Sequence, residues 1–216
     1  GSIDGSSNYV KNNFPKTKII QLDKNYGFAK GNNKGIKEAF KDKEVGYIVC
    51  LNNDTIVDKN WLKELIKTVK KDKKIGSVSS KAYFSDGKTI QNAGLIFTPV
   101  LQINKEGGIS LGYGLTDKKA PEFSKDIEIF VSGGVAPLYK RKILETIYKR
   151  DKEIFDEDFF AYAEDLDLGF RIRSLGYKSF LSANAKLIHL HSQTGKKASP
   201  FKAYYCERNT YLTAIK

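Results

Sequence analysis

The feature that most constrains the fold is an apolar run at 47–51 (YIVCL) that stops abruptly at the polar tripeptide 52–54 (NND). A continuous run of this length is typical of a strand covered on both faces. Short apolar runs at 18–22 and 75–80 have the same character, and segments with helical spacing lie between them. Strands that alternate with helices predict an α/β sandwich with a mainly parallel, mixed central sheet.

The rest of the chain has neither an internal repeat nor a low-complexity linker, so we expect 1–216 to be a single domain. A Gly/Asn-rich turn is expected at 25–35, and hairpins with a mobile loop between 81 and 124. The other expected elements are helices at 36–40, at 140–149 and after Asp167, strands at 127–131, 178–181 and 186–190, and a helical tail at 201–216.

Composition excludes several classes of protein. Hydrophobic residues make up 40% of the 216 residues, which is enough to bury a core and excludes a fully disordered chain. No apolar run approaches the roughly 20 residues of a membrane-spanning helix. The two cysteines, Cys50 and Cys206, are too few for a disulfide framework or a zinc cluster and fit a reducing cytosol.

The charge is strongly positive and unevenly distributed. The net charge of +12 favours anionic partners such as nucleotides, nucleic acid or an anionic membrane. Residues 151–167 nevertheless hold eight acids against one base, whereas 181–216 are basic. An acidic pocket beside a basic surface fits a metal-dependent enzyme acting on an anionic substrate better than a DNA-binding protein. We expect the lysine run at 70–74 to be a solvated helix end.

The tripeptide 52–54 is the first candidate site. Ligands of open α/β sheets bind at the carboxyl ends of strands, where Asp54 is expected. A carboxylate there can hold Mg²⁺ or Mn²⁺, which favour oxygen ligands. The alternative is a polar turn whose side chains cap the following helix.

The second candidate is the acidic segment 164–167 (EDLD), expected at a helix N-terminus, where a carboxylate is stabilised. An ionised, oriented Asp165 would suit general base catalysis. The alternative is that these are ordinary first-turn acids. The surrounding aromatic residues suit either sugar recognition or plain packing: Phe155, Phe159, Phe160 and Tyr162.

Two weaker candidates complete the set. His189 and His191 alternate on an expected strand, so only one of them can point into a site, and a purely structural histidine is the alternative. A helix and a returning strand could bring His189 beside Asp165. The glycines at 25–35 could let the backbone approach a phosphate at the following helix N-terminus, although a simple turn explains them equally well.

Taken in order, the motifs resemble the inverting glycosyltransferases of family two, which have the GT-A fold. The resemblance is strongest to the bacterial rhamnosyltransferase-like branch of surface polysaccharide synthesis. The segments that carry it are DGSSNYV (4–10), NYGFAKGNNKG (25–35), LNNDTIVDKNWL (51–62), SGGVAPLYKR (132–141), FDEDFFAYAEDLDLGFR (155–171), LGYK (175–178), AKLIH (185–189) and ERN (207–209).

The resemblance implies roles for these residues. Asp54 would ligate a Mg²⁺ or Mn²⁺ ion bound to the donor diphosphate, with His189 completing the coordination, and Asp165 would be the catalytic base. The remaining implied contacts are with the nucleotide or donor at Asn32, Asn33, Asn52 and Asn53, and with the acceptor or sugar at Gly133, Gly134 and Glu164.

The resemblance also implies partners. We expect a UDP- or dTDP-linked sugar donor and a glycan or lipid-linked acceptor, and no nucleic acid. Family members carry a strand, a helix and a second strand before the segment at 4–10, so we expect an N-terminally truncated enzyme that lacks its first nucleotide-binding segment and its first strand. Its open sheet edge could pair with a second copy.

The location is expected to be cytoplasmic, with the basic aromatic tail at 201–216 beginning a C-terminal helical extension that contacts the inner membrane face. A plain helix packed on the domain is the alternative for this tail. For the whole chain, the alternatives to an enzyme are a non-catalytic sugar- or nucleotide-binding module and, further off, a basic nucleic-acid binder.

Overall fold

The computed structural model describes residues 1–96, 109–190 and 200–216. Within them, a seven-stranded sheet has the order β1-β8-β3-β9-β2, with β4 beside β3 and β7 beside β9, and β5 and β6 form a separate pair. The strands are β1 (Tyr47–Val49), β2 (Thr55–Val57), β3 (Ile75–Tyr83), β4 (Ile90–Asn92), β5 (Leu95–Ile96), β6 (Ile109–Ser110), β7 (Ile127–Ile129), β8 (Leu138–Lys140) and β9 (Lys178–His189).

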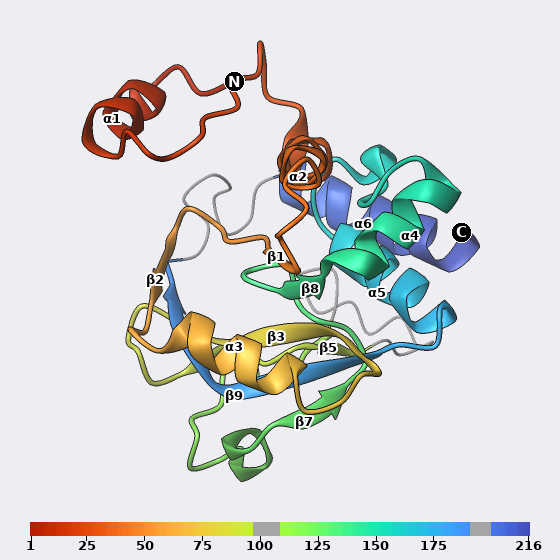
Figure 1. Cartoon of the computed structure of the whole chain (residues 1–216). Helices are drawn as coiled ribbons and strands as arrows, with labels where there is room; N and C mark the ends of the chain where they lie inside the picture. The colour runs from red at the N-terminus through yellow and green to blue at the C-terminus, as the bar shows by residue number, and fades with distance from the viewer. Residues whose placement is uncertain (97–108, 191–199) are drawn as a thin grey trace.

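Helices cover both faces of the sheet (Figure 1). Neighbouring residues of β8 show this, because successive side chains of a strand point to opposite faces. Leu138 packs with Trp61 and Leu65 of α3, whereas Tyr139 packs in the cluster formed by α2, α4 and α5. The expected α/β sandwich is confirmed, with helices on both faces of the sheet. The helices are α1 (Ser6–Asn13), α2 (Gly27–Ala39), α3 (Trp61–Val69), α4 (Arg141–Asp151), α5 (Glu164–Ser174) and α6 (Pro200–Ile215), with short 3₁₀ turns η1 (Pro121–Ser124) and η2 (Glu157–Phe159).

The sheet is mixed, as expected, but the expectation that it is mainly parallel is wrong for the described strands. Among them, β3 and β9 form the one parallel pair of this sheet. β1, β3 and β9 do run in the same direction, yet β8 lies between β1 and β3 and pairs antiparallel with both. Reading strands in chain order could not reveal this insertion, because β8 follows β3 by more than fifty residues.

Three local expectations also need correction. The run at 18–22 forms no strand in the described structure, and both Ile19 and Ile20 are exposed. Helix α2 begins at Gly27, so most of the expected turn at 25–35 is helical. Its inner face explains the early start, because Ala29, Asn33 and Ile36 are all buried at helical spacing. The two short strands expected at 178–190 are one strand, β9.

The two ends of the chain are packed differently. Helix α1 contributes no buried residue and stands apart from the body of the molecule (Figure 1). Helix α6 packs against the domain, where the ring of Tyr205 stacks on Phe160 at 5.3 Å and Cys206 is buried. None of the helices in the described ranges combines the length and the apolar character that crossing a membrane requires.

Candidate active site

Asp165 occupies the first turn of α5, and two backbone amides hold its carboxylate. The N–H of Gly134 donates to Oδ2 at 2.6 Å, and the N–H of Leu166 donates to Oδ1 at 2.8 Å. Burial raises the pKa of Asp165, although the hydrogen bonds from Gly134 and Leu166 oppose the rise. A fixed carboxylate with a raised proton affinity is suited to taking a proton from a bound hydroxyl.

A strained turn places this helix. Phe160, Tyr162 and Ala163 all have positive φ angles of 60°, 71° and 64°, a region that L-residues rarely adopt. Asn209 of α6 holds the turn: its Nδ2 donates to the carbonyl oxygens of residues 159, 161 and 162 at 2.7 to 2.8 Å. Backbone strain of this kind persists only where surrounding contacts enforce it. Asn209 therefore positions the turn that leads into Asp165.

Glu164, next to Asp165, differs from it in environment. Its side chain is buried, and its Oε2 has no hydrogen-bond partner in the described structure. Burial, together with the neighbouring Asp165 carboxyl, raises the pKa of Glu164 to about 8. The two backbone hydrogen bonds favour the ionised form of Asp165, whereas burial beside that carboxyl favours the protonated form of Glu164. The same pair of acids would repel a diphosphate more strongly if both were ionised.

Asp54 and His189 face each other across the β2–β9 ladder, in which Thr55 pairs with His189. Asp54 Oδ1 lies 3.0 Å from His189 Nε2, and His189 Nδ1 lies 2.6 Å from Gln91 Oε1. Because an amide oxygen can only accept a hydrogen bond, Nδ1 carries the ring proton. Burial lowers the pKa of His189, although Asp54 opposes the shift. In the tautomer with the proton on Nδ1, the neutral ring offers the lone pair of Nε2 to a cation beside Asp54 Oδ1.

Two electron-pair donors that face each other in this way fit a divalent cation. A carboxylate oxygen suits Mg²⁺ or Mn²⁺, and imidazole is a common nitrogen ligand of transition metals. The Gln91 contact has the form usual for a metal-binding histidine, whose other ring nitrogen donates to an oxygen. Within the described ranges, no group of three or more His, Cys, Asp or Glu side chains is placed to hold a metal. Asp54 and His189 would therefore leave most coordination positions to phosphate oxygens and water.

Contacts along two routes link this pair to Asp165. In the first, the N–H of Asn52 donates to Val135 O at 3.0 Å, next to Gly134, which binds Asp165. In the second, Asn92 adjoins Gln91 and packs on Gly133 so closely that a Cβ there would lie 2.5 Å from Asn92 Oδ1. The structure thus brings the segments at 52–54 and 133–134, α5 and the end of β9 to the same end of the sheet.

The asparagines expected to contact a donor fall in different places. Asn52 is half-buried and Asn53 is exposed on the loop before β2. The side chain of Asn32 donates to Phe28 O within α2. Asn33 departs from the expectation: it is 0% exposed, donates to Phe155 O at 2.7 Å and accepts from Phe155 N at 2.9 Å. Its side chain ties α2 to the segment before η2, so Asn33 leaves the set of donor-binding candidates.

Sequence reasoning missed two residues, Gln91 and Asn209. Gln91 lies 98 positions from His189 in the chain, and no motif links the two. Asn209 stands in the ERN segment at 207–209, which is the one signal that could have found it. Its neighbour Arg208 also reaches the site turn by donating to Asp158 O at 2.8 Å. The other expected histidine, His191, lies outside the described residues.

Comparisons with known proteins identify the fold and the family of the chain. The chain is 27% identical over 192 residues to O-antigen biosynthesis protein RfbC of Myxococcus xanthus. The matched region covers 85% of this chain and 14% of that protein. Its fold is similar to that of GalNAc-T7 with UDP, GalNAc and Mn²⁺ (TM-score 0.63, 14% identity, 92% of this chain and 36% of that chain). It is also similar to mannosyltransferase PcManGT of Pyrobaculum calidifontis with GDP-Man and Mn²⁺ (TM-score 0.61, 16% identity, 100% of this chain and 52% of that chain).

These matches confirm the expected GT-A fold. The chain spans only a part of each of these proteins, from about one seventh to about half of their length. The model of the family described as glycosyl transferase family 2 matches residues 1–148, which is more than half of the chain. The chain therefore belongs to glycosyl transferase family 2.

Proposed function

We propose that this chain transfers a sugar, with inversion, from a nucleotide-diphosphate donor to a hydroxyl of a cell-surface polysaccharide or lipid-linked acceptor. The observation that carries the proposal is the Asp165 carboxylate, fixed by Gly134 and Leu166 at the end of the sheet that also holds Asp54 and His189. The family and the fold support sugar transfer. The similarity to an O-antigen biosynthesis protein supports a surface polysaccharide as the class of product.

The reaction follows from the site. Asp165 accepts the proton of an acceptor hydroxyl, and the oxygen attacks the anomeric carbon from the side opposite the nucleotide. The carbon–oxygen bond to the diphosphate breaks, and the nucleoside diphosphate leaves with the bonding electrons. A Mg²⁺ or Mn²⁺ ion, when bound, neutralises charge on this leaving group. Asp54 and His189 would hold the ion, and Gly134 keeps Asp165 aimed at the acceptor.

The test measures nucleoside diphosphate release from UDP- and dTDP-sugars with Mn²⁺ and a glycan or lipid-linked acceptor pool. Asp165→Asn should abolish transfer and leave Mn²⁺-dependent binding of the nucleotide intact, whereas Asp54→Ala should weaken that binding. Glu122→Gln, at an exposed carboxylate on η1, is the matched control and should behave as wild type. Transfer that survives in Asp165→Asn would refute the role of this residue.

The non-catalytic alternative has a distinct result. A sugar- or nucleotide-binding module would bind UDP or dTDP with Mn²⁺, release no product with any donor, and lose nothing in Asp165→Asn. A nucleic-acid binder would instead show sequence or structure preference together with a steep salt dependence. Neither alternative calls for a carboxylate that two backbone amides hold beside a second, buried acid.

Contact with the inner membrane face is a further part of the proposal. Tyr204 and Tyr211 of α6 are exposed, while Tyr205 and Cys206 of the same helix pack inward. An exposed aromatic stripe on a basic segment can lie at a lipid interface. Sedimentation with vesicles that contain anionic lipid should carry down the wild type and less of a Tyr204→Ser, Tyr211→Ser variant. Pelleting that does not depend on anionic lipid would count against membrane contact.

Pairing of two copies through the sheet edge also stays a proposal. Among the described strands, β1 ends the strand order on one side of the sheet, and an unpaired strand edge is a template for another strand. Analytical ultracentrifugation over a range of concentrations would detect a dimer. A sedimentation coefficient that stays at the monomer value would refute it.

A further inference from the structure

A cavity of about 600 Å³ opens on the sheet away from the Asp165 carboxylate. Its floor belongs to β2 and β9, where Ile56 pairs with Ile188. Lys186 and Ile188 of β9 alternate with Leu187, which packs under α3. The cavity therefore lies on the face of these strands opposite α3. The turns at 87–88 and 116–118 contribute its walls.

The floor is apolar and open to solvent. Ile56 is 57% exposed, and its strand partner Ile188, on the same face, is half-buried. Exposed aliphatic side chains at the bottom of a cavity offer a surface for the C–H face of a ligand. A cavity of this volume accommodates one to a few sugar rings. Charged side chains at its edges, among them Lys88, Asp117 and Lys118, favour a ligand that also carries polar groups.

One wall holds a built cluster of polar groups around Asp117. Lys81, which is almost completely buried, places Nζ 2.6 Å from Asp117 Oδ1. The hydroxyl of Tyr83 donates to both oxygens of Asp117, at 3.1 and 2.9 Å. These contacts keep Asp117 ionised and fixed while it remains partly exposed in the cavity. A carboxylate held in this way accepts hydrogen bonds from ligand hydroxyls.

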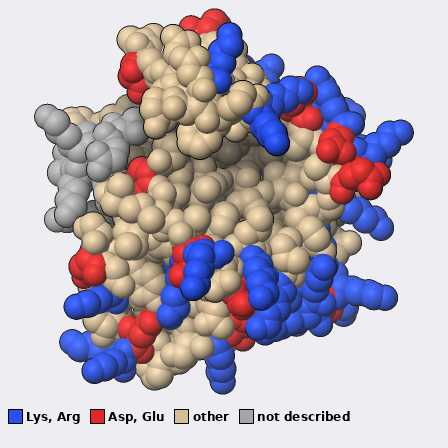
Figure 2. Space-filling model, turned by 60° about the vertical axis from the view of Figure 1, so that its left-hand side comes forward, with Lys and Arg blue, Asp and Glu red and all other residues tan. Residues whose placement is uncertain are grey.

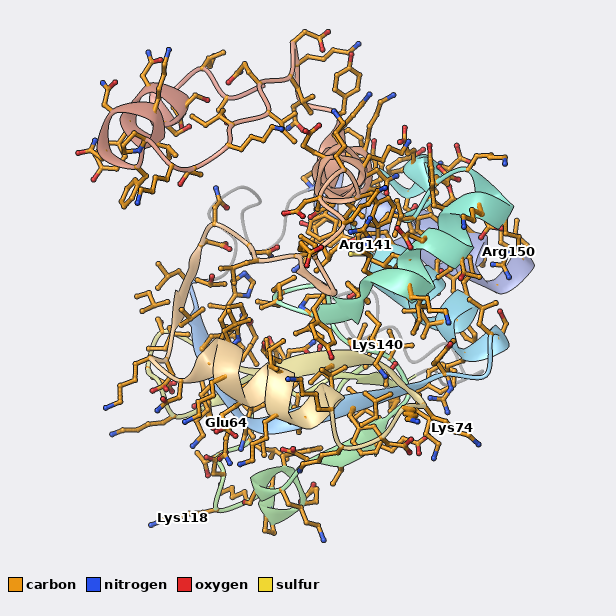
Figure 3. All side chains as sticks on the ribbon, in the orientation of Figure 1. Glu64, Lys74, Lys118, Lys140, Arg141 and Arg150 are labelled. Carbon is orange, nitrogen blue, oxygen red and sulfur yellow. The ribbon has the colours of Figure 1, made fainter. Side chains whose placement is uncertain are left out.

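Lysines dominate the remaining charge of the cavity. Lys88, Lys118 and Lys186 line it, against Asp58 and Asp117, and Asp117 is paired with Lys81 and, at 4.0 Å, with Lys186. In Figure 3, Lys118 lies at the lower left, on the opposite side of the view from Arg150 of α4. Figure 2 shows Lys and Arg gathered over the lower part of the face that it presents. The cavity thus combines a carboxylate that can accept hydrogen bonds from hydroxyls, an apolar floor and more lysines than acids. These features together favour a hydroxyl-rich anion as the ligand.

We propose that this cavity binds an acidic saccharide unit of the acceptor glycan. The assignment of the ligand as acceptor rests on the proposed function, whereas its chemistry rests on the cavity. The backbone of the cavity floor adjoins the Asp54–His189 pair, because Ile188 directly precedes His189 and Ile56 lies two residues after Asp54. Successive side chains of a strand point to opposite faces, so the His189 ring points to the other face of the sheet from Ile188. A glycan bound here would reach the Asp54–His189 pair around β2, which ends the strand order of the described sheet on this side.

The experiment measures binding of trigalacturonate by calorimetry, with neutral galactotriose and inorganic phosphate as the comparison probes. A Lys118→Ala, Lys186→Ala variant should bind trigalacturonate at least tenfold more weakly than wild type. Lys43→Ala, Lys149→Ala, at exposed lysines outside the cavity, removes the same charge and should bind as wild type. Ile56→Ser tests the apolar floor separately and should also weaken binding.

Several results would overturn the proposal. Equal weakening in both lysine pairs would mean that only overall charge matters. Equally tight binding of galactotriose would remove the acidic requirement, and displacement of trigalacturonate by millimolar phosphate would make this an anion site without sugar recognition. Mn²⁺-dependent UDP binding, measured on the same samples, separates the two proposals. If UDP does not bind but trigalacturonate does, only the proposed function is contradicted. If UDP binds but trigalacturonate does not, only the proposal for this cavity is contradicted.

Discussion

Removing the side chain of Asn209 should loosen the turn that positions Asp165. The side chain is 0% exposed, and its two N–H bonds are shared among the carbonyls of residues 159, 161 and 162. A net contribution of about 1 kcal/mol for each N–H, together with the cost of leaving buried carbonyls without donors, gives about 2–4 kcal/mol for Asn209→Ala. Water cannot replace these donors without opening the contact between α6 and the turn.

Urea unfolding followed through the single tryptophan, the buried Trp61, measures this loss. Asn209→Asp keeps the shape but presents oxygen to three carbonyls, so it should destabilise at least as much as Asn209→Ala. Thr210→Ala, which removes one hydrogen bond within α6, is the matched control and should cost less than about 1 kcal/mol. In the transfer assay, Asn209→Ala should lower kcat and leave Mn²⁺-dependent UDP affinity unchanged. A loss of stability below about 0.5 kcal/mol, or a loss confined to UDP affinity, would refute the reasoning.

Three other changes test the site. Gln91→Leu leaves the Nδ1 proton of His189 without its acceptor and should weaken Mn²⁺ binding about 10- to 100-fold, measured by calorimetry; unchanged affinity would remove Gln91 from the metal site. Glu164→Gln should flatten the pH dependence of stability. Because the folded-state pKa of Glu164 is raised, its contribution to stability is fully present below about pH 4.5 and is lost as pH rises toward about 8. The free energy of unfolding should therefore differ less between about pH 6 and about pH 9 in the variant than in the wild type. An equal difference in both proteins would contradict a buried acid at this position. Gly134→Ala places a Cβ 3.1 Å from Asp165 Oδ2 and should reduce kcat without weakening UDP binding. A variant with the kcat of the wild type would show that the close packing of residue 134 on Asp165 is unimportant for catalysis.

Much of the site could be expected from local patterns. An apolar run that ends at Asp54 indicates a strand end, and the acids before an amphipathic segment indicate a helix N-terminus at Asp165. Both features depend on residues close together in the chain. The resemblance to family two added the pairing of these segments with His189, and the structure places them at the same end of the sheet.

Other features depended on contacts that no local pattern records. The buried Asn33 looked like part of a ligand-binding loop because its partner, Phe155, lies 122 residues away. The run at 18–22 has the composition of a strand, but a strand also needs a neighbour to pair with, and composition carries no information on pairing. The predominance of antiparallel pairs has the same origin, because β8 enters between strands that precede it in the chain.

The sequence by itself therefore determined the kinds of element, the order of the motifs and the position of the two principal carboxylates at element ends. Only the tertiary structure decided the neighbours of β8, the contact of Gln91 with His189 and the hydrogen bonds by which Asn209 holds the turn before Asp165. The physical reason is the separation along the chain over which each kind of interaction acts. Periodicity and capping act over a few residues, whereas strand pairing and buried hydrogen bonds join side chains that are close only after the core has formed.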